Sequence, residues 1–307
     1  MNILVTGGGG FIGSHIVDAY IEQGHHVMIL DNLSSGKKTN INPKAVFYQM
    51  DLLDPETKAI FQKEDIEVIN HHAAQASVIR SVADPVFDAN SNIIGALQLL
   101  QNAVSFGIKK IVFASTGGAL YGDQDQLPAC EDVPCRPSSP YGISKLCLEN
   151  YLTFYKNVYN LNPVIFRYSN VFGPRQDPHG EAGVISIFCR RLAQHQSPVI
   201  FGDGEQTRDF ISVGDVVRAN LLALEANCSG TFNIGTGKET SINELTKQLV
   251  RVSGRTVEIQ YEPARKGEQR RSAIDHRKFN EKFGWQPRHA LEEDLLGTWE
   301  YFRNNHE

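Results

Sequence analysis

Near its start the chain reads Asn2-Ile3-Leu4-Val5-Thr6-Gly7-Gly8-Gly9-Gly10-Phe11-Ile12-Gly13. This stretch is a short apolar run, a glycine-rich turn and the first residues of a helical pattern that extends over 12–23. Gly7, Gly10 and Gly13 fit the spacing G-x-x-G-x-x-G, and Gly8 begins an overlapping G-x-G-x-x-G. Glycines permit a tight turn and a close approach of the backbone to a pyrophosphate, and the start of the helix offers unpaired N–H groups to its charges. The stretch therefore predicts a dinucleotide-binding fold.

An acidic residue follows at the spacing that such a fold requires. Asp31 closes the next apolar run, over 26–30, and lies 18 residues after Gly13. A carboxylate at about this distance from the glycines accepts hydrogen bonds from the ribose hydroxyls of the dinucleotide. The same negative charge repels a 2′-phosphate, so the sequence favours NAD over NADP.

Short β-branched runs alternate with helical patterns through the first half of the chain. This alternation predicts βαβ units with right-handed crossovers, which build a Rossmann-type, doubly wound parallel sheet of the α/β class with helices on both faces. The elements after about residue 170 are shorter and richer in Gly and Pro. We therefore expect an NAD-binding domain over 1–170 and a smaller C-terminal α/β domain over 171–307 that mainly binds the substrate, with some later segments returning to the first. Strands are expected at 3–6, 26–30, 45–49, 68–70, 111–114 and 164–167, and helices at 12–23, 55–62, 86–106 and 141–159.

The composition narrows the partners and the location of the protein. The 307 residues carry a formal net charge of -5, which argues against a nucleic acid or an anionic membrane as the main partner. No apolar run approaches the ~20 residues that span a bilayer, and the N-terminus has no basic flank or small-residue cleavage site, so the expected location is the cytoplasm. The pairs His25-His26 and His71-His72 are not expected to bind a metal, because adjacent residues on a strand point to opposite faces.

A second motif, Tyr141-Gly142-Ile143-Ser144-Lys145, opens the long helical pattern over 141–159. Residues four apart lie on the same face of a helix, so the phenol of Tyr141 and the ammonium of Lys145 can converge on one point. A free tyrosine titrates near pH 10, and we expect the lysine and a nicotinamide ring to lower the pKa of Tyr141 until its phenolate serves as a base. Lys145 can also hold the nicotinamide ribose. The spacing alone is common on solvated helix faces, and the preceding dinucleotide motif is what indicates a catalytic pair.

Together these motifs resemble the extended short-chain dehydrogenases/reductases, and within them the UDP-glucose 4-epimerase family, over nearly the whole chain. The stretches that carry the resemblance, besides the two motifs, are 31–36, 51–52, 72–78, 166–176, 179–185, 202–210 and 265–268. The resemblance implies that NAD is held by Gly7, Gly10, Phe11, Ile12, Gly13, Asp31, Asn32, Ser35, Gly36, Asp51, Leu52, Ala73, Ala74, Gln75, Asn92, Tyr141, Lys145 and Tyr168.

The resemblance also implies which side chains bind a UDP-sugar. Arg208 and Arg265 would hold the diphosphate, which planar guanidinium groups suit well, and Glu268 would bind the uridine ribose. The small side chain of Ser272 would leave room for a 2-N-acetyl group on the sugar. The full set of implied substrate contacts is Thr116, Tyr141, Asn170, Val184, Arg208, Arg265, Glu268 and Ser272.

The chain departs from this family at the catalytic serine. The family usually places that serine four residues before a Tyr-Gly pair, and here Tyr121-Gly122 puts Gly117 at that position. The hydroxyl that bonds the 4-oxygen of the sugar is therefore expected from Thr116, with Ser115 as the alternative, or its role passes to Tyr141 or water.

Gly117 and Gly118 also separate the chain from related families. Sugar-nucleotide 4,6-dehydratases need an Asp-Glu pair here, and UDP-glucuronate decarboxylases commonly carry a glutamate. The resemblance therefore implies reversible C4 epimerisation of a UDP-hexose (UDP-glucose and UDP-galactose, with UDP-N-acetylhexosamines as further candidates) through a transient 4-keto sugar and enzyme-bound NADH. The alternatives are UDP-glucuronate 4-epimerisation, a reductase or dehydratase step, or a non-catalytic NAD-binding sensor. By the same resemblance, the helices over 86–106 and 141–159 are expected to form a homodimer interface.

Overall fold

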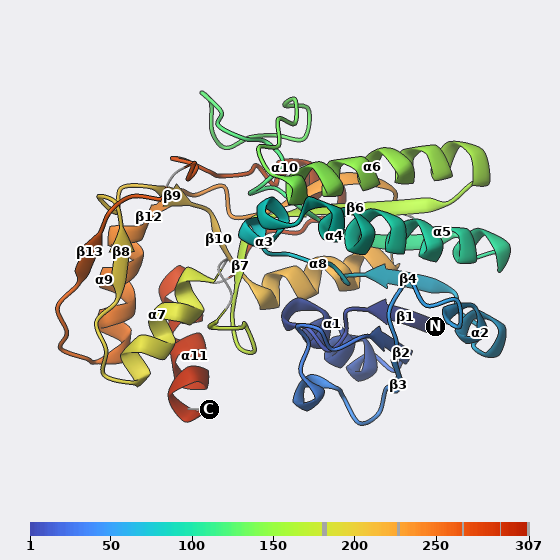
Figure 1. The fold of residues 1–307 in the computed structure, drawn as a ribbon, viewed down its shortest axis with the longest axis horizontal. Coiled ribbons are helices and arrows are strands. Elements are labelled where there is room, and N and C mark those ends of the chain that lie inside the picture. The colour runs from blue at the N-terminus through green and yellow to red at the C-terminus, as the bar shows by residue number, and fades with distance from the viewer. Residues whose placement is uncertain (180–182, 226–227, 266, 289, 306–307) are drawn as a thin grey trace.

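The computed structural model describes residues 1–179, 183–225, 228–265, 267–288 and 290–305 (Figure 1). Its centre is a seven-stranded parallel sheet, in the order β11 (Gly230–Ile234), β6 (Asn162–Tyr168), β5 (Lys110–Thr116), β4 (Val68–His71), β1 (Asn2–Thr6), β2 (His26–Asp31) and β3 (Val46–Gln49). The chain first moves outward from β1 to β3 and then crosses to β4 on the other side of β1. This reversal of strand order is the doubly wound arrangement, so the predicted Rossmann-type fold is confirmed.

The central strands are apolar on both faces because helices cover both faces. Leu4 and Met28 point into one core, and Ile3 and Val5 point into the other, since successive residues of a strand face opposite sides. Burying each of these side chains stabilises the fold by roughly 1.5–3 kcal/mol relative to exposure. One core is closed by α2 (Thr57–Lys63), α5 (Gly95–Ser105) and α6 (Pro140–Tyr159), and the other by α1 (Phe11–Glu22) and α8 (Val213–Glu225).

The region that was expected to be one helix over 86–106 is interrupted. The structure has α3 (Val78–Ala83), α4 (Pro85–Ala89), a π-helical turn η2 (Asn90–Ile94) and then α5. Asp84 separates α3 from α4, and its side chain accepts a 2.9 Å hydrogen bond from the backbone N–H of Phe87. The apolar periodicity of the sequence did not reveal the π turn, which shifts the register of the residues before it.

The second half of the chain supplies a separate core beside the carboxyl edge of the sheet (Figure 1). This core is built mainly by α7 (Val184–Ala193), α9 (Ile242–Ser253) and α11 (Leu291–Asn304). Between these helices β11 and α8 return to the large sheet. The remaining elements are η1 (Lys38–Asn40), β7 (Asn170–Phe172), β8 (Val199–Phe201), β9 (Thr207–Arg208), β10 (Phe210–Ser212), β12 (Thr240–Ser241), β13 (Gln260–Glu262) and α10 (Arg277–Phe283). None of the helices in the described residues is long and apolar enough to cross a membrane.

Candidate active site

The glycine-rich turn lies at the carboxyl end of β1, where the strand order reverses. Gly7 has a φ of 73°, and a Cβ at this residue would lie 2.6 Å from the backbone nitrogen of Ala73. A Cβ on Gly13 would collide with the carbonyl oxygen of Gly7. Both positions therefore require glycine. Gly10 caps α1 without a side-chain hydrogen bond, so the first N–H groups of α1 remain for a phosphate.

Asp31 ends β2 beside this turn and is buried. One carboxylate oxygen accepts a 2.8 Å hydrogen bond from the N–H of Gly9, and the other accepts a 2.8 Å bond from the N–H of Leu33. A Cβ on Gly36 would lie 3.1 Å from both oxygens, so the segment 31–36 folds back over the acid. The amide of Asn32 donates a 2.6 Å hydrogen bond to Asp51, which lies just after β3. The predicted contacts Ser35 and Leu52 adjoin these residues in the chain.

These features fit NAD. A pyrophosphate needs a backbone that it can approach and a set of free N–H groups, and the turn provides both through its glycines and through Phe11 and Ile12, which open α1. A ribose needs an acceptor, and the Asp31 carboxylate lies within hydrogen-bond reach of the same turn.

The loop after β4 forms another wall of the turn. The N–H of Ala73 donates a 3.2 Å hydrogen bond to Thr6 Oγ1, and Ala74 follows it. The side-chain amide of Asn92 forms two hydrogen bonds with the backbone of Gln75. It accepts a 2.8 Å bond from the N–H of Gln75 and donates a 2.9 Å bond to its carbonyl. Asn92 is buried, and its second N–H also reaches Asp88, so the structure places its side chain behind the loop. Asn92 therefore holds Gln75 in position from behind the loop.

Tyr141 and Lys145 occupy the first turns of α6, whose start is fixed by the N-cap Ser139 and by Pro140. The ammonium of Lys145 lies 5.9 Å from the centre of the Tyr141 ring and donates a 2.8 Å hydrogen bond to the carbonyl of Ala114. Burial lowers the pKa of Lys145 to about 8. The pair therefore converges as its spacing predicts.

The pKa of Tyr141 differs from the expectation. Burial, and then the negative charge of Asp88, raise the pKa of the phenol well above its ordinary value. In the protein alone Tyr141 is therefore protonated at neutral pH.

Ser115 and Thr116, the two candidates for the helper hydroxyl, end β5 with different surroundings. Ser115 is buried, and its hydroxyl donates a 2.6 Å hydrogen bond to Glu149. The hydroxyl of Thr116 accepts a 3.2 Å hydrogen bond from the N–H of Ala119. A Cβ on Gly118 would lie 4.0 Å from Thr116 Oγ1 and 3.7 Å from Oδ1 of Asn170, so both groups border the space that this glycine leaves open.

Position 117 faces away from that space. A Cβ on Gly117 would lie 2.7 Å from the Cδ1 methyl of Ile274, inside a small apolar cluster. A serine at this position would therefore be directed at the core. The geometry favours Thr116 as the hydroxyl that takes the place of the family's serine.

Tyr168 and Asn170 complete this edge of the sheet. Tyr168 ends β6, its ring stacks on that of His72 at 5.9 Å, and its hydroxyl accepts a 2.9 Å hydrogen bond from Asn220. The Oδ1 atom of Asn170 is buried and has no hydrogen-bond partner among the described residues. A buried acceptor of this kind is costly unless a ligand or water satisfies it.

The residues expected to hold a diphosphate and a ribose come from the second half of the chain. Arg208 and Glu268 form an ion pair of 3.4 Å, and Arg208 is largely buried. The guanidinium of Arg265 lies 4.0 Å from the centre of the Phe201 ring, in a cation–π contact. Ser272 is buried. Val184 begins α7. Within the matching stretches, residues 180–182 and 266 lie outside the described residues.

Two buried groups next to the catalytic pair were not identified from the sequence. Glu149 and Arg167 form a buried ion pair of 2.6 Å that also receives the hydroxyl of Ser115. Asp88 is fully buried and accepts a 2.6 Å hydrogen bond from Ser144. Glu149 lies four residues after Lys145, on the same face of α6, and this spacing is the one signal that could have indicated it.

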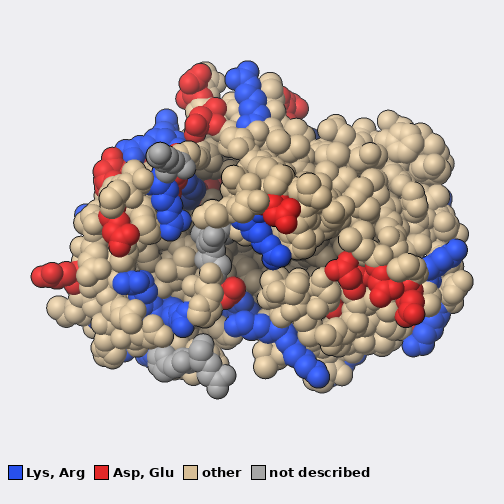
Figure 2. Space-filling model, in the orientation of Figure 1, with Lys and Arg blue, Asp and Glu red and all other residues tan. Residues whose placement is uncertain are grey.

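The surface is hollowed between the sheet and the second core, and Lys and Arg side chains gather around the hollow (Figure 2). Positive charge is thus local in a chain whose net charge is -5. A cavity of about 420 Å³ lies between the loop after β2 and the helices α7 and α11, with Lys37, Arg175 and Arg190 in its lining.

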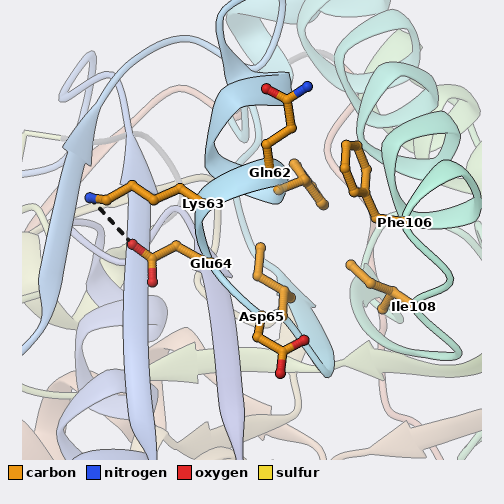
Figure 3. Close-up of a pocket in the computed structure, with 8 residues that line it drawn as sticks. Gln62, Lys63, Glu64, Asp65, Phe106 and Ile108 are labelled. Atoms are coloured by element: carbon orange, nitrogen blue, oxygen red, sulfur yellow. Dashed lines mark ion pairs between the residues drawn. The ribbon is translucent and has the colours of Figure 1, made fainter.

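A second cavity, of about 240 Å³, lies between the end of α2 and the end of α5 (Figure 3). Its lining includes Asp65 and Ile108, which precede β4 and β5. It therefore opens at the amino edge of the parallel sheet, opposite the glycine-rich turn. Ligands of such sheets bind at the carboxyl edge, so this cavity is separate from the active site.

Comparison with known proteins supports the assignment of an NAD-binding site to the carboxyl edge of the sheet. Residues 3–235 match the model of the NAD dependent epimerase/dehydratase family. The chain belongs to this family. A UDP-glucose 4-epimerase from Thermotoga maritima, solved with UDP-glucose, is 50% identical, with a TM-score of 0.98 and full coverage (100%) of both chains. A UDP-glucose 4-epimerase from Thermus thermophilus, solved with NAD, is 42% identical over 99% of each chain, with a TM-score of 0.95.

A further similar structure is named for a nucleotide sugar that carries an N-acetyl group. It is a UDP-N-acetylglucosamine 4-epimerase from Methanobrevibacter ruminantium, solved with UDP-N-acetylmuramic acid. It is 38% identical to this chain, covers 99% of it and 98% of its own length, and has a TM-score of 0.94.

Proposed function

We propose that this enzyme interconverts UDP-glucose and UDP-galactose by reversible epimerisation at carbon 4 of the sugar, with NAD kept on the protein throughout the cycle. The observation that carries the proposal is the composition of the catalytic edge. Tyr141 and Lys145 converge at the start of α6, Thr116 ends the neighbouring strand β5, and positions 117 and 118 supply no carboxylate. Elimination of water, as in a dehydratase, needs an acid and a base at that place. Removal and return of the same hydrogen does not.

Tyr141 moves the proton of the 4-hydroxyl. Its phenol oxygen takes that proton when carbon 4 is oxidised and gives it back when carbon 4 is reduced. NAD, when bound, supplies the oxidation and re-reduction of carbon 4. Lys145 has a pKa of about 8 and so carries a positive charge at neutral pH, which favours the ionised phenol. The hydroxyl of Thr116 donates a hydrogen bond to the 4-oxygen.

The two ends of the substrate have different requirements. The sugar ring must turn over between the two half-reactions, so a firm hold is expected only on the nucleotide. Arg208, with Glu268 beside it, and Arg265 supply that hold from the second half of the chain. At the open space beside Thr116 and Asn170 the chain presents the small residue Gly118.

UDP-N-acetylhexosamines are proposed as further substrates. Ser272 is a small side chain in a buried stretch that pairs with Ala129 at Ile274, close to Gly117. A similar protein acts on UDP-N-acetylglucosamine. A 2-N-acetyl group needs space next to the sugar ring, and a serine leaves more of it than a large side chain would.

A substrate panel without added NAD tests the proposal. Purified enzyme is incubated with UDP-glucose, UDP-N-acetylglucosamine, UDP-glucuronate and dTDP-glucose, and the products are read by NMR. Conversion of UDP-glucose to UDP-galactose is expected, and Tyr141→Phe should lower its rate by roughly 10²–10⁴-fold. Ser272→Tyr should abolish turnover of the N-acetylated sugar alone. Formation of a 4-keto-6-deoxy product, or full activity of Tyr141→Phe, would contradict the assignment.

We also propose that the enzyme is a cytoplasmic homodimer. All five cysteines are unpaired, as in reducing compartments. Exposed apolar side chains gather on α3, α4 and α6, and Figure 2 shows a broad area without charged residues where Figure 1 draws α5 and α6. An apolar face of this kind is typical of a surface that a second copy covers. Its members are Val78, Ile79, Val82, Val86, Ile94, Ile143, Tyr151, Phe154, Val158 and Tyr159.

A further inference from the structure

Asp88 is a fully buried carboxylate on α4, with 0% of its surface exposed. Its Oδ2 atom accepts a 2.6 Å hydrogen bond from the hydroxyl of Ser144, and its Oδ1 atom accepts bonds of 2.9 Å from Gln75 and 3.0 Å from Asn92. A buried charge is tolerated only when it is well bonded, and three donors meet that condition. The donors come from three different parts of the chain.

Each of these three donors lies on, or is bonded to, a segment that borders the active site. Ser144 lies on α6, between Tyr141 and Lys145. Gln75 lies in the loop after β4, whose residue Ala73 would be 2.6 Å from a Cβ on Gly7. Asn92, in the π-helical turn, holds both the N–H and the carbonyl of Gln75. One carboxylate thus joins the catalytic helix to the loop that borders the dinucleotide turn.

We propose that Asp88 is a positioning residue, which fixes Tyr141 and Lys145 relative to the bound dinucleotide through Ser144 and places a negative charge beside the pair. Its kinetic consequences rest on the proposed epimerase function. A misplacement of about 1 Å in a catalytic group can lower a rate by about 10²-fold, so the bond from Ser144 matters for the rate as well as for the fold.

The negative charge of Asp88 also shifts the pKa values of the catalytic pair. It raises the pKa of Tyr141, after burial, and it raises the pKa of Lys145, against the larger effect of burial. The other groups that face the pair are Glu149 on α6, which also raises the pKa of Lys145, and His71 and His72 at the end of β4, whose pKa values burial lowers to about 3. Both histidines are therefore neutral at working pH, and Asp88 and Glu149 are the negative charges.

Removing the charge should therefore move the pH profile. In Asp88→Asn the pKa values of Tyr141 and Lys145 both fall, so both limbs of the pH profile of kcat should shift to lower pH. In Ser144→Ala the charge stays and the bond is lost, so kcat should fall by about 10-fold or more at an unchanged pH profile. KM for the UDP-sugar should change little in either variant.

Ser81→Ala is the matched control. Ser81 is also fully buried, but its hydroxyl donates to the carbonyl of Val78 within α3. It should lose a similar amount of stability with kcat and the pH profile of the wild type. The release rate of bound NAD, measured by its absorbance after dilution and filtration, is a readout that needs no UDP-sugar. It should rise in Asp88→Asn, because the hydrogen bonds from Gln75 and Asn92 then end on a neutral oxygen and are weaker than those to a carboxylate.

The outcomes separate the two proposals. If the wild type turns over no UDP-sugar, the proposed function fails, and faster NAD release in Asp88→Asn but not in Ser81→Ala still supports a positioning role. An Asp88→Asn enzyme with wild-type kcat, pH profile and NAD release would overturn that role. So would a Ser144→Ala enzyme that behaves like Ser81→Ala, because the link to the catalytic helix would then have no effect.

Discussion

The hydroxyl of Ser115 donates a 2.6 Å hydrogen bond to the carboxylate of Glu149, eight residues beyond Tyr141 on α6. The same carboxylate receives the guanidinium of Arg167 at 2.6 Å. Ser115 therefore belongs to a buried network beneath the active site. Its neighbour Thr116 faces the opposite side of the sheet, toward Asn170, because consecutive residues of a strand alternate.

This division predicts opposite effects for the two hydroxyls. Thr116→Val removes a hydrogen bond to the 4-oxygen, which carries developing charge, so about 1.5–3 kcal/mol of transition-state stabilisation should be lost. That loss corresponds to a fall in kcat of roughly 10–100-fold. Ser115→Ala should leave kcat close to wild type and lower the free energy of unfolding by about 1 kcal/mol. Steady-state kinetics and urea unfolding of both variants test this, and a larger kinetic loss in Ser115→Ala would reverse the assignment.

Gly7 and Gly24 offer a matched test of the dinucleotide turn. Both have left-handed φ angles, of 73° and 79°, but a Cβ on Gly24 would meet nothing within 4 Å. Each alanine variant should lose about 1–2 kcal/mol of stability from backbone strain. Only Gly7→Ala adds a collision with Ala73, so it alone should be purified without NAD, as measured by the ratio of absorbance at 260 and 280 nm. Loss of NAD from Gly24→Ala would show that strain and not the close approach is responsible.

The buried charge of Lys145 is predicted to lower the free energy of unfolding. Its pKa is about 8 in the folded protein against 10.5 in the unfolded chain, and at 1.36 kcal/mol for each pKa unit the buried charge costs about 3 kcal/mol at pH 7. Lys145→Met should therefore raise the free energy of unfolding by about 2–3 kcal/mol, after allowance for the lost hydrogen bond to Ala114, while abolishing activity.

Because folding lowers the pKa of Lys145, the stability cost of its buried charge depends on pH. Below pH 8 both states are protonated and the full cost is present. Between pH 8 and 10.5 only the unfolded state keeps the proton, so the wild type gains stability with rising pH and the advantage of Lys145→Met disappears. Urea unfolding at pH 7, 9 and 10.5 measures this convergence. An advantage that stays constant over this range would mean that packing and not charge burial is the cause.

The apolar face of α6 predicts the oligomeric state. Phe154 is 49% exposed and Tyr261, on β13 in the other half of the chain, is 56% exposed. A glutamate at position 154 would bury a charge if a second copy covers this face, so Phe154→Glu should convert the dimer into a monomer in light scattering. Tyr261→Glu should remain a dimer. A monomeric wild type, or a dimeric Phe154→Glu, would refute the proposed interface.

The sequence predicted the features of this site that are local in the chain. The glycine-rich turn, Asp31 and the Tyr141–Lys145 pair each depend on spacings within one strand–helix unit, and local backbone geometry largely determines where they lie. The pairings that tertiary contact creates were not predictable in this way. Ser115 meets Glu149 across 34 residues and Ser144 meets Asp88 across 56, and no local pattern records either distance.

The second half of the chain was predicted only in outline for a related reason. Strands such as β9 and β12 are two residues long, which is too short to show a period of two. The π-helical turn was missed because it adds a residue to one turn without changing the apolar character around it. The direction of the pKa of Tyr141 also needed the structure, because it depends on burial and on the distant Asp88.

The pairing of β11 with β6 has a consequence for synthesis. The ribosome completes β6 at Tyr168 and reaches β11 only at Gly230, 62 residues later. At about 5–20 residues per second this interval is roughly 3–12 s. Throughout that interval the nascent sheet ends in a long apolar edge, which is a template for pairing with other chains. The speed of elongation between these two strands therefore bears directly on how much of the newly made protein escapes aggregation.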